Sequence, residues 1–256
     1  MLFNDQGSTT PPSLFAISQP AHALISGRIL AAWSAPLHPD TVLAAEQHDM
    51  AWIDWEVSPS FDPATGRPHF FRHIGASLHA PMWDKGVERA SAAWGRRVAL
   101  LLSRHGSTIY ERFSDRHRSV GTEARTEDDR AAQDYLARHR PLQDSWRRAL
   151  GLEADDVARE ADLLACVDTL SLILCGALPA PSGLEVAGRT LALAAVPGTS
   201  ATYSLDPWPL AVDEIVFETE ARALPSSGRF SDEAGMRAWL AKPTRITMRS
   251  SLRRQA

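Results

Sequence analysis

The chain has 256 residues, enough to bury a substantial hydrophobic core within one large domain. Hydrophobic residues account for 44% and charged residues for 23%, which excludes a disordered chain and is typical of a globular protein. The formal net charge of −4 argues against a general nucleic-acid-binding protein, so we expect no nucleic-acid partner.

The sequence also predicts where the protein resides. Its first residues lack the basic and apolar regions of a signal peptide, and the longest apolar stretch, residues 163–180, is too interrupted to span a membrane. Cys166 and Cys175 lie too far apart along one predicted helix to form a disulfide within it. These features predict a reduced, cytoplasmic protein with no membrane partner.

Taken in chain order, the sequence begins with an irregular segment and two predicted helices. Residues 1–14 are polar and include two prolines, which indicates an irregular lead-in. Apolar residues at helical spacing predict one helix over residues 19–34 and a second over residues 39–49.

A long loop and two more helices are predicted next. Prolines and glycines over residues 57–75 indicate a loop of a length that is often functional. A third helix is predicted over residues 81–104, with Gly106 just beyond its end. Residues 111–130 are rich in charge and lack an apolar period, which indicates a mobile excursion. A capping-box pattern predicts a helix over residues 126–150.

The last predicted helix, residues 155–175, is the most apolar one, and the composition changes after it. Beyond Pro181, short apolar runs separated by proline and glycine are typical of strands. We therefore expect a mainly α fold. In it, a helical core of residues 15–180 carries a small β-rich C-terminal part, residues 181–256, within one structural domain.

Histidines and aspartates in the apolar helices are the candidate metal ligands. Taken singly, such a histidine is more often a hydrogen-bonded core residue, whereas a buried aspartate must be paired or bind a cation. His48 and Asp49 stand side by side, and a set of six such residues is typical of a two-metal site. The six predicted ligands are His22, His48, Asp49, His79, His105 and Asp168.

Several segments around these ligands resemble a known family. Their order of histidines and aspartates is similar to that of the HD-domain metalloproteins and, more narrowly, the segments resemble the DUF3891 family over most of residues 18–180. This sequence departs from the family pattern at Ala51, where the family tends to have glycine. We expect this difference to affect local packing more than metal ligation. The segments are QPAHALISGRI, HDMAWIDWE, GRPHFF, LLLSRHG and DTLSLILCG.

The resemblance implies an HD-like helical core that binds two divalent metal ions. The residues implied to hold the first ion are His22, His48, Asp49 and Asp168. Asp49 would bridge to a second ion, held by His79 and His105. Since the set contains no thiolate, Fe or Mn are the most natural metals. His73 competes with His79, and we favour His79 because it precedes a helix.

Two divalent cations beside two carboxylates leave positive charge, which suits a small anionic substrate. The resemblance implies hydrolysis of a phosphate ester by metal-activated hydroxide. Lys85 and Arg104 are the candidate catalytic cations, although a solvated surface lysine is the commoner situation. Arg67 and Arg72 lie in the long loop, and Arg72 is the candidate for a substrate contact.

Aromatic and acidic residues close to the His48–Asp49 pair complete the predicted site. Trp52 and Trp55 would wall the substrate pocket, although core packing is the commoner role for such residues. Glu56 would hydrogen-bond a ligand histidine and assist catalysis in this way. The histidines predicted to be solvated are His38, His69, His117 and His139.

Two other functions stay open. Some HD-domain proteins, such as the inositol oxygenases, are mixed-valence di-iron oxygenases with the same order of ligands. That alternative stays open because this sequence offers few obvious arginines or lysines for binding a phosphate. The other alternative is a non-enzymatic, metal-stabilised binding protein. Iron-dependent absorption with O₂ consumption would indicate an oxygenase, and turnover of a phosphodiester with Mn²⁺ would indicate a hydrolase.

Overall fold

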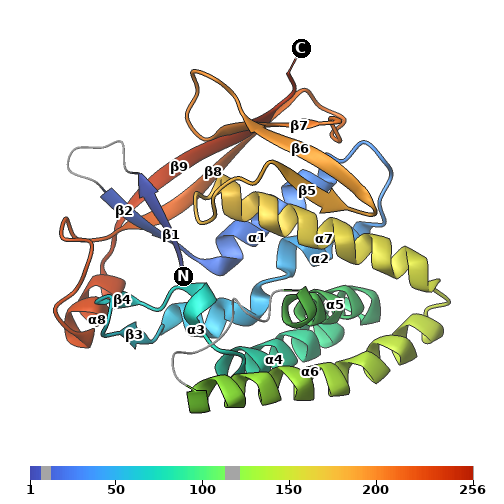
Figure 1. The fold of residues 1–256 in the computed structure, drawn as a ribbon, viewed down its shortest axis with the longest axis horizontal. Helices are drawn as coiled ribbons and strands as arrows, with labels where there is room; N and C mark the ends of the chain where they lie inside the picture. The colour runs from blue at the N-terminus through green and yellow to red at the C-terminus, as the bar shows by residue number, and fades with distance from the viewer. Residues whose placement is uncertain (7–12, 113–121, 256) are drawn as a thin grey trace.

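A seven-stranded sheet occupies one side of the protein, and the long helices lie beneath it (Figure 1). The computed structural model describes residues 1–6, 13–112 and 122–255. The strands of the sheet are β1 (Leu2–Gln6), β2 (Ser13–Ile17), β5 (Gly183–Val186), β6 (Arg189–Ala195), β7 (Thr202–Asp206), β8 (Glu214–Ala223) and β9 (Thr244–Arg253). Their order is β1-β2-β8-β9-β7-β6-β5, with β7 and β9 parallel and all other neighbours antiparallel.

The helices form two layers below the sheet. The long ones are α1 (Gln19–Ala31), α2 (Pro39–Gln47), α4 (Ala76–Trp94), α5 (Arg96–Arg112), α6 (Thr122–Ala149) and α7 (Ala154–Leu174). The short elements are η1 (Met50–Trp52), α3 (Ile53–Val57), β3 (Phe61–Asp62), β4 (Arg67–Pro68), η2 (Phe71–His73) and α8 (Glu233–Ala241). Helices α1 and α7 contact the sheet, whereas α4, α5 and α6 pack together on the side away from it (Figure 1).

Helices α1 and α7 share a hydrophobic core with the sheet. Ile25 and Ile29 of α1, Leu170 and Leu174 of α7, and Phe217 of β8 are all buried in it. Because removal of apolar side chains from water is the main stabilising contribution to folding, this core fixes α1 and α7 against the sheet. The same two helices carry two of the predicted metal ligands, His22 on α1 and Asp168 on α7.

The prediction of a mainly α fold with a small β-rich C-terminal part was wrong. The protein combines helices with a seven-stranded sheet, and strands from both ends of the chain build that sheet. The lead-in, residues 1–14, contains β1 and the start of β2, while its residues 7–12 lie outside the described part. Strand β2 pairs with β8 through Phe15 and Ala223. Such long-range pairing stabilises strands whose own sequence has no clear strand pattern.

The predicted third helix consists of two helices. Helix α4 ends at Trp94, and Gly95 follows with a φ of 90°, a conformation that glycine adopts at little cost. Gly106, expected to end the helix, lies inside α5 and packs against Tyr135 of α6. The break at Gly95 lets α5 fold back along α4.

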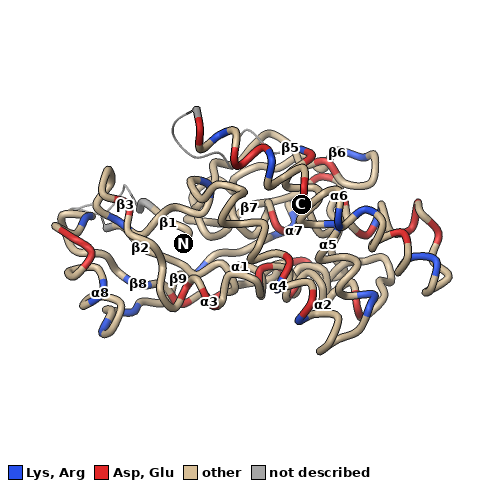
Figure 2. The backbone as a smooth tube through the Cα atoms, turned by 90° about the horizontal axis from the view of Figure 1, so that it is seen from below, with Lys and Arg blue, Asp and Glu red and all other residues tan. Residues whose placement is uncertain are grey.

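The segment predicted to be a mobile excursion, residues 111–130, includes the first turns of α6. Its residues 113–121 lie outside the described part. Acidic and basic residues are interspersed along the described chain (Figure 2). Both cysteines are free and buried, and no helix in the described ranges is long and apolar enough to cross a membrane.

A glycine permits close packing between α4 and the segment that follows α2. A methyl group placed on Gly86 would lie only 2.7 Å from the Cβ of Ala51. Non-bonded carbon atoms normally lie about 3.5–4.0 Å apart, so a larger residue at position 86 would push the two segments apart. Alanine at position 51 therefore fits because position 86 is glycine.

We expect Gly86→Ala to lower the free energy of unfolding by about 1–3 kcal/mol through overpacking. In the double variant with Ala51→Gly, the cost should be smaller than the sum of the two single changes by at least about 0.5 kcal/mol. Urea denaturation of the two single variants and the double variant tests this. Gly235→Ala in α8 is the control, because its methyl group would meet its nearest neighbour at an ordinary 3.4 Å. Strictly additive costs would contradict the proposed contact.

Candidate metal centre

Five of the six predicted ligands converge at one point between four helices. We call them the His–Asp cluster, and its members are His22 of α1, His48 and Asp49 after α2, His105 of α5 and Asp168 of α7. Within it, one donor atom from each of His22, His48 and Asp49 lies within 4.8 Å of the others. The same holds for His48, His105 and Asp168. Each set could hold a metal ion.

A local break in the helix lets both members of the doublet face the cluster. On a continuous helix, adjacent side chains point about 100° apart. Helix α2 ends at Gln47, and Asp49 leaves the helical conformation with φ −101° and ψ 18°. The Oδ2 atom of Asp49 consequently lies 3.5 Å from His22 Nε2 and 3.9 Å from His48 Nε2.

The ring of His48 is oriented as a metal-binding imidazole. Its Nδ1 is 2.8 Å from the carbonyl oxygen of Ala45, which can only accept a hydrogen bond, so Nδ1 carries a proton. This leaves Nε2 directed at Asp168 Oδ1, 3.2 Å away. A backbone carbonyl that fixes the tautomer in this way is a common partner of metal-ligating histidines.

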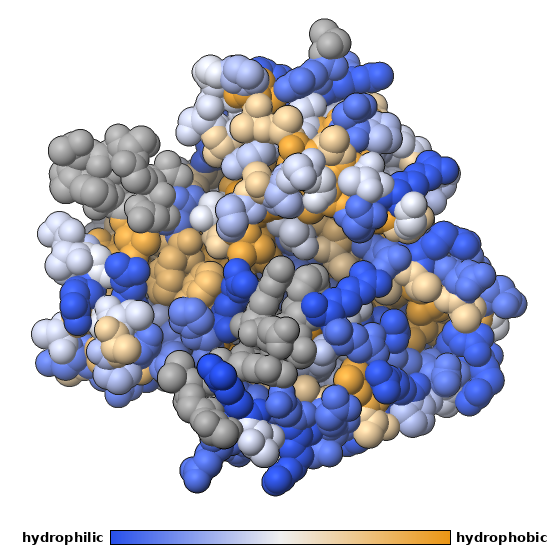
Figure 3. Space-filling view, in the orientation of Figure 1, coloured by the Kyte–Doolittle hydropathy of each residue, from blue (hydrophilic) through white to orange (hydrophobic). Residues whose placement is uncertain are grey.

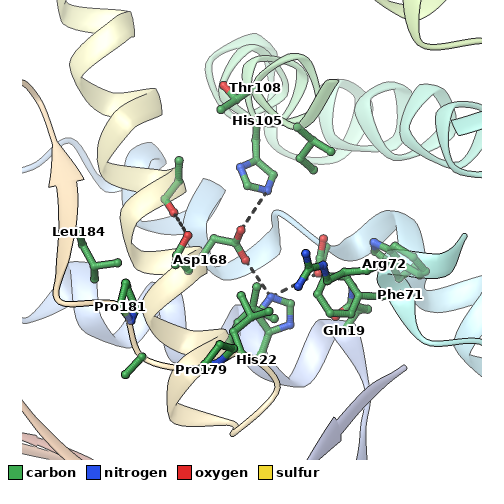
Figure 4. A pocket seen from close by; sticks show the side chains of 18 of the residues that line it. Gln19, His22, Phe71, Arg72, His105, Thr108, Asp168, Pro179, Pro181 and Leu184 are labelled. Carbon is green, nitrogen blue, oxygen red and sulfur yellow. Dashed lines mark hydrogen bonds and ion pairs between the residues drawn. The ribbon is translucent and has the colours of Figure 1, made fainter. Parts of the chain in front are cut away.

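The two carboxylate oxygens of Asp168 face different histidines. Oδ1 lies 3.0 Å from His22 Nε2 and 3.2 Å from His48 Nε2, whereas Oδ2 lies 3.8 Å from His105 Nε2 (Figure 4). Its side chain keeps 19% of its surface exposed toward the pocket. This is the arrangement of a carboxylate that can bridge two cations, a role that the family resemblance implied for Asp49.

The two carboxylates of the cluster favour a positive charge at its centre. Burial lowers the pKa of His48, but the carboxylates of Asp49 and Asp168 outweigh burial and raise it to about 9. Burial raises the pKa of Asp49. Burial also acts to raise the pKa of Asp168, yet hydrogen bonds with His22 and His48 hold it well below its usual value. Without a metal ion, the proton of His48 is therefore the cation, and a metal ion would replace it.

The pKa of His105 is shifted in the opposite direction from that of His48. Burial lowers its pKa to about 3, despite the attraction of Asp168. Its Nδ1 is buried without a hydrogen-bond partner in the described structure, and so is Nδ1 of His22. A neutral imidazole close to a carboxylate is the form that ligates metals.

His79, the sixth predicted ligand, lies in the same pocket, but both of its ring nitrogens are engaged elsewhere. Trp83 Nε1 donates a hydrogen bond to His79 Nε2 at 2.7 Å. Because an indole nitrogen only donates, Nδ1 of His79 carries the proton and donates to Tyr110 Oη at 3.2 Å. His79 therefore presents its ring to the pocket, where it lies 5.0 Å from the ring of Trp52. The competing His73 is exposed in η2 and does not line the pocket.

A cavity of about 480 Å³ opens onto the His–Asp cluster. Trp52, Arg72 and His79 line it together with the cluster residues other than His48. The apolar part of the lining comes from Phe71, Ile109, Ala165, Leu172, Leu178, Pro179, Ala180, Pro181 and Leu184. In Figure 3, hydrophobic side chains gather in the middle of the face, between hydrophilic edges. The cavity is thus a mostly apolar pocket with the polar cluster in its wall.

The structure places the other predicted site residues away from this cavity. Lys85 is exposed on α4, and Arg104 is half-buried with its Nη1 3.3 Å from Gln143 Oε1. Trp55 is buried beside Trp52 without lining the pocket. Glu56 does not contact a ligand histidine: its Oε1 accepts from the backbone N–H of Gln19 at 3.0 Å and lies 3.5 Å from the Met1 amino group.

The prediction that four other histidines are solvated was only partly correct. His38 is exposed and His69 is half-buried, whereas His117 lies outside the described residues. His139 is buried, so that prediction was wrong. Its Nε2 bonds Asp84 Oδ1 at 2.7 Å and its Nδ1 lies 2.8 Å from Ser103 Oγ. These partners lie on α4 and α5, and no local pattern around His139 indicates them.

Some pocket residues were not identified from the sequence. Gln19, the first residue of α1, lines the cavity, and its Oε1 is buried without a hydrogen-bond partner in the described structure. Thr108 and Thr169 stand one turn or less from His105 and Asp168 and also line it. The helical spacing of the two threonines from their neighbouring ligands could have indicated them, whereas nothing in the sequence singles out Gln19.

Comparison with known proteins agrees with the narrower resemblance. The family model described as "Protein of unknown function (DUF3891)" matches residues 1–226. A comparison with curated proteins and one with solved structures gave no match. The matched residues make up most of the chain and include the whole His–Asp cluster, so the chain belongs to the DUF3891 family.

Proposed function

We propose that the protein is a metal-dependent hydrolase of phosphate esters, of the HD type, with two divalent metal ions at the His–Asp cluster. The observation that carries this proposal is the position of Asp168, whose two oxygens face separate histidines. A carboxylate that ligates with both oxygens is characteristic of two-metal sites, and such sites commonly serve phosphoryl transfer.

The residues of the cluster divide between the two ions. His22, His48, Asp49 and Asp168 would hold the first ion. Asp168 and His105 would hold the second ion, which would leave positions for water and substrate. The donors are nitrogen and oxygen atoms only, which favours Fe or Mn. His79 takes no part in ligation here, because Trp83 and Tyr110 use its nitrogens.

Divalent ions in this position supply Lewis acidity and lower the pKa of a bound water. The chain itself provides the rest of the site. Arg72 donates hydrogen bonds to the phosphoryl oxygens, because a guanidinium binds such oxygens in a forked geometry. Trp52 and Phe71 keep bulk water away from the reacting group, which strengthens these charged interactions.

A di-iron oxygenase of a small polar substrate is the second candidate. The observation that favours it is that Arg72 is the one arginine or lysine among the described lining residues. Phosphoryl transfer usually employs several cations beside the metal ions. Iron-loaded protein that consumes O₂ but does not release phosphate from any ester would favour the oxygenase.

We expect purified protein to hold about two metal ions per chain, and Asp168→Asn to lose both of them, because a bridging carboxylate serves each site. His73→Gln should keep the full metal content, since His73 is exposed outside the pocket. His79→Gln should also keep it. Metal analysis after dialysis measures the content, and circular dichroism establishes that each variant is folded. Unchanged metal content in Asp168→Asn would exclude the proposed centre.

Metal affinity should depend on pH through His48. Because its pKa of about 9 keeps His48 protonated at neutral pH, each ion bound at the first site must displace that proton. The apparent affinity for Mn²⁺ should therefore rise about tenfold per pH unit between pH 6 and pH 8. Calorimetric titrations in two buffers with different ionisation enthalpies count the released protons. Binding without proton release at pH 7 would contradict the assignment.

Hydrolysis should depend on Arg72 and not on Lys85. We expect Arg72→Gln to lower kcat/KM for 4-nitrophenyl phosphate by at least about tenfold, through loss of charge-assisted hydrogen bonds. Lys85→Gln should leave kcat/KM unchanged, because Lys85 is exposed and does not line the cavity. Release of 4-nitrophenol by the Mn²⁺-loaded protein is the measurement. An equal loss in both variants would contradict a specific role for Arg72.

A further inference from the structure

The cavity has a polar side and an apolar side, with the cluster between them. In Figure 4, Arg72 and Gln19 lie on one side of the His22–Asp168 pair, and Pro181 and Leu184 lie on the other. Arg72 offers a positive charge on this side of the cavity, so an anionic group is best accommodated next to it and the cluster.

The apolar side is built by the segment that links α7 to the sheet. Leu178, Pro179, Ala180 and Pro181 all line the cavity, and Leu184 of β5 continues the same wall. Ile109 of α5 adds a further apolar contribution. A ligand with an apolar body gains by burial against such a wall, whereas a polar one loses hydrogen bonds to water there.

Hydrogen-bond donors for a polar ligand are few among the described lining residues. The hydroxyl of Thr108 donates to the carbonyl of Arg104 at 2.9 Å, and that of Thr169 donates to the carbonyl of Ala165 at 3.0 Å. Both protons are thus used within their own helices. With Arg72 as the one arginine or lysine in this lining, a sugar, a nucleobase or a chain of several phosphates would leave many polar groups unpaired.

From these features we infer that the substrate is a phosphate monoester with an apolar alkyl or aryl alcohol, and not a nucleotide or a sugar phosphate. The inference rests on the proposed function in taking the anionic group to be a phosphoryl group. That group lies between the cluster and Arg72, and the alcohol part lies along residues 178–184. Hydrolysis adds water across the P–O bond and releases inorganic phosphate and the apolar alcohol.

Binding of non-hydrolysable phosphonates tests the ligand class. Calorimetry on the Mn²⁺-loaded protein compares octylphosphonate with methylphosphonate, which share the anionic group. We expect octylphosphonate to bind at least tenfold more tightly. Leu178→Ser and Ile109→Thr, both at half-buried positions, should remove most of this preference. The matched controls are Leu24→Ser and Ile53→Thr, which change exposed residues outside the cavity and should keep the preference.

A parallel activity assay separates failure of the inference from failure of the proposed function. Octyl phosphate and AMP are offered to the same Mn²⁺-loaded protein, and release of phosphate is measured. A higher kcat/KM for octyl phosphate supports the inference. A higher kcat/KM for AMP, or equal affinities for the two phosphonates, would overturn it. If octylphosphonate is preferred but no ester is hydrolysed, the ligand class stands and the proposed function fails.

Discussion

The carboxylate of Asp168 controls the architecture of the site, because it stands among three imidazoles in the apolar C-terminal half of α7. An unpaired carboxylate in such a position would cost several kcal/mol, so its charge needs the histidines that face it. These histidines come from α1, from the end of α2 and from α5. One buried charge on α7 thus links side chains from four helical segments.

The apolar residues around the His–Asp cluster shift the pKa values of its members. The core between α1, α7 and the sheet is buried, and the cluster lies between this core and the cavity. Low polarity strengthens each charged interaction, which explains why neighbouring groups have opposite shifts: the pKa of His48 is raised to about 9 and that of His105 is lowered to about 3. Divergent pKa values among adjacent groups are common at functional sites.

Much of the cluster could be predicted from the sequence, because an imidazole or a carboxylate within an apolar helix needs a partner. That reasoning identified His22, His48, Asp49, His105 and Asp168, which the fold brings together. It could not predict which oxygen faces which histidine, since this depends on the packing of distant helices. The engagement of His79 by Trp83 was visible in principle, because the two residues are four apart on one helix.

The seven-stranded sheet and the positions of the candidate arginines and lysine could not be predicted either, because both depend on contacts between distant parts of the chain. Strand β2 gains its partner from the far end of the chain, so periodicity around it carries no signal. Arg104 was chosen because it stands beside His105, and Lys85 because it lies on the predicted third helix, whereas neither residue lines the cavity. Arg72 was recognised only as a member of a long loop. Loop residues reach a site through tertiary structure, which a local pattern does not encode.

The pairing of β2 with β8 also has a consequence for synthesis of the protein on the ribosome. All seven helices from α1 to α7 emerge before β8 does, and during this time the edge of β2 that β8 will cover has no partner. An open strand edge is a template for aggregation, so the nascent chain passes through a vulnerable stage that ends only when β8 is translated and docks. Chaperone demand should thus be greatest for chains that stall before residue 214.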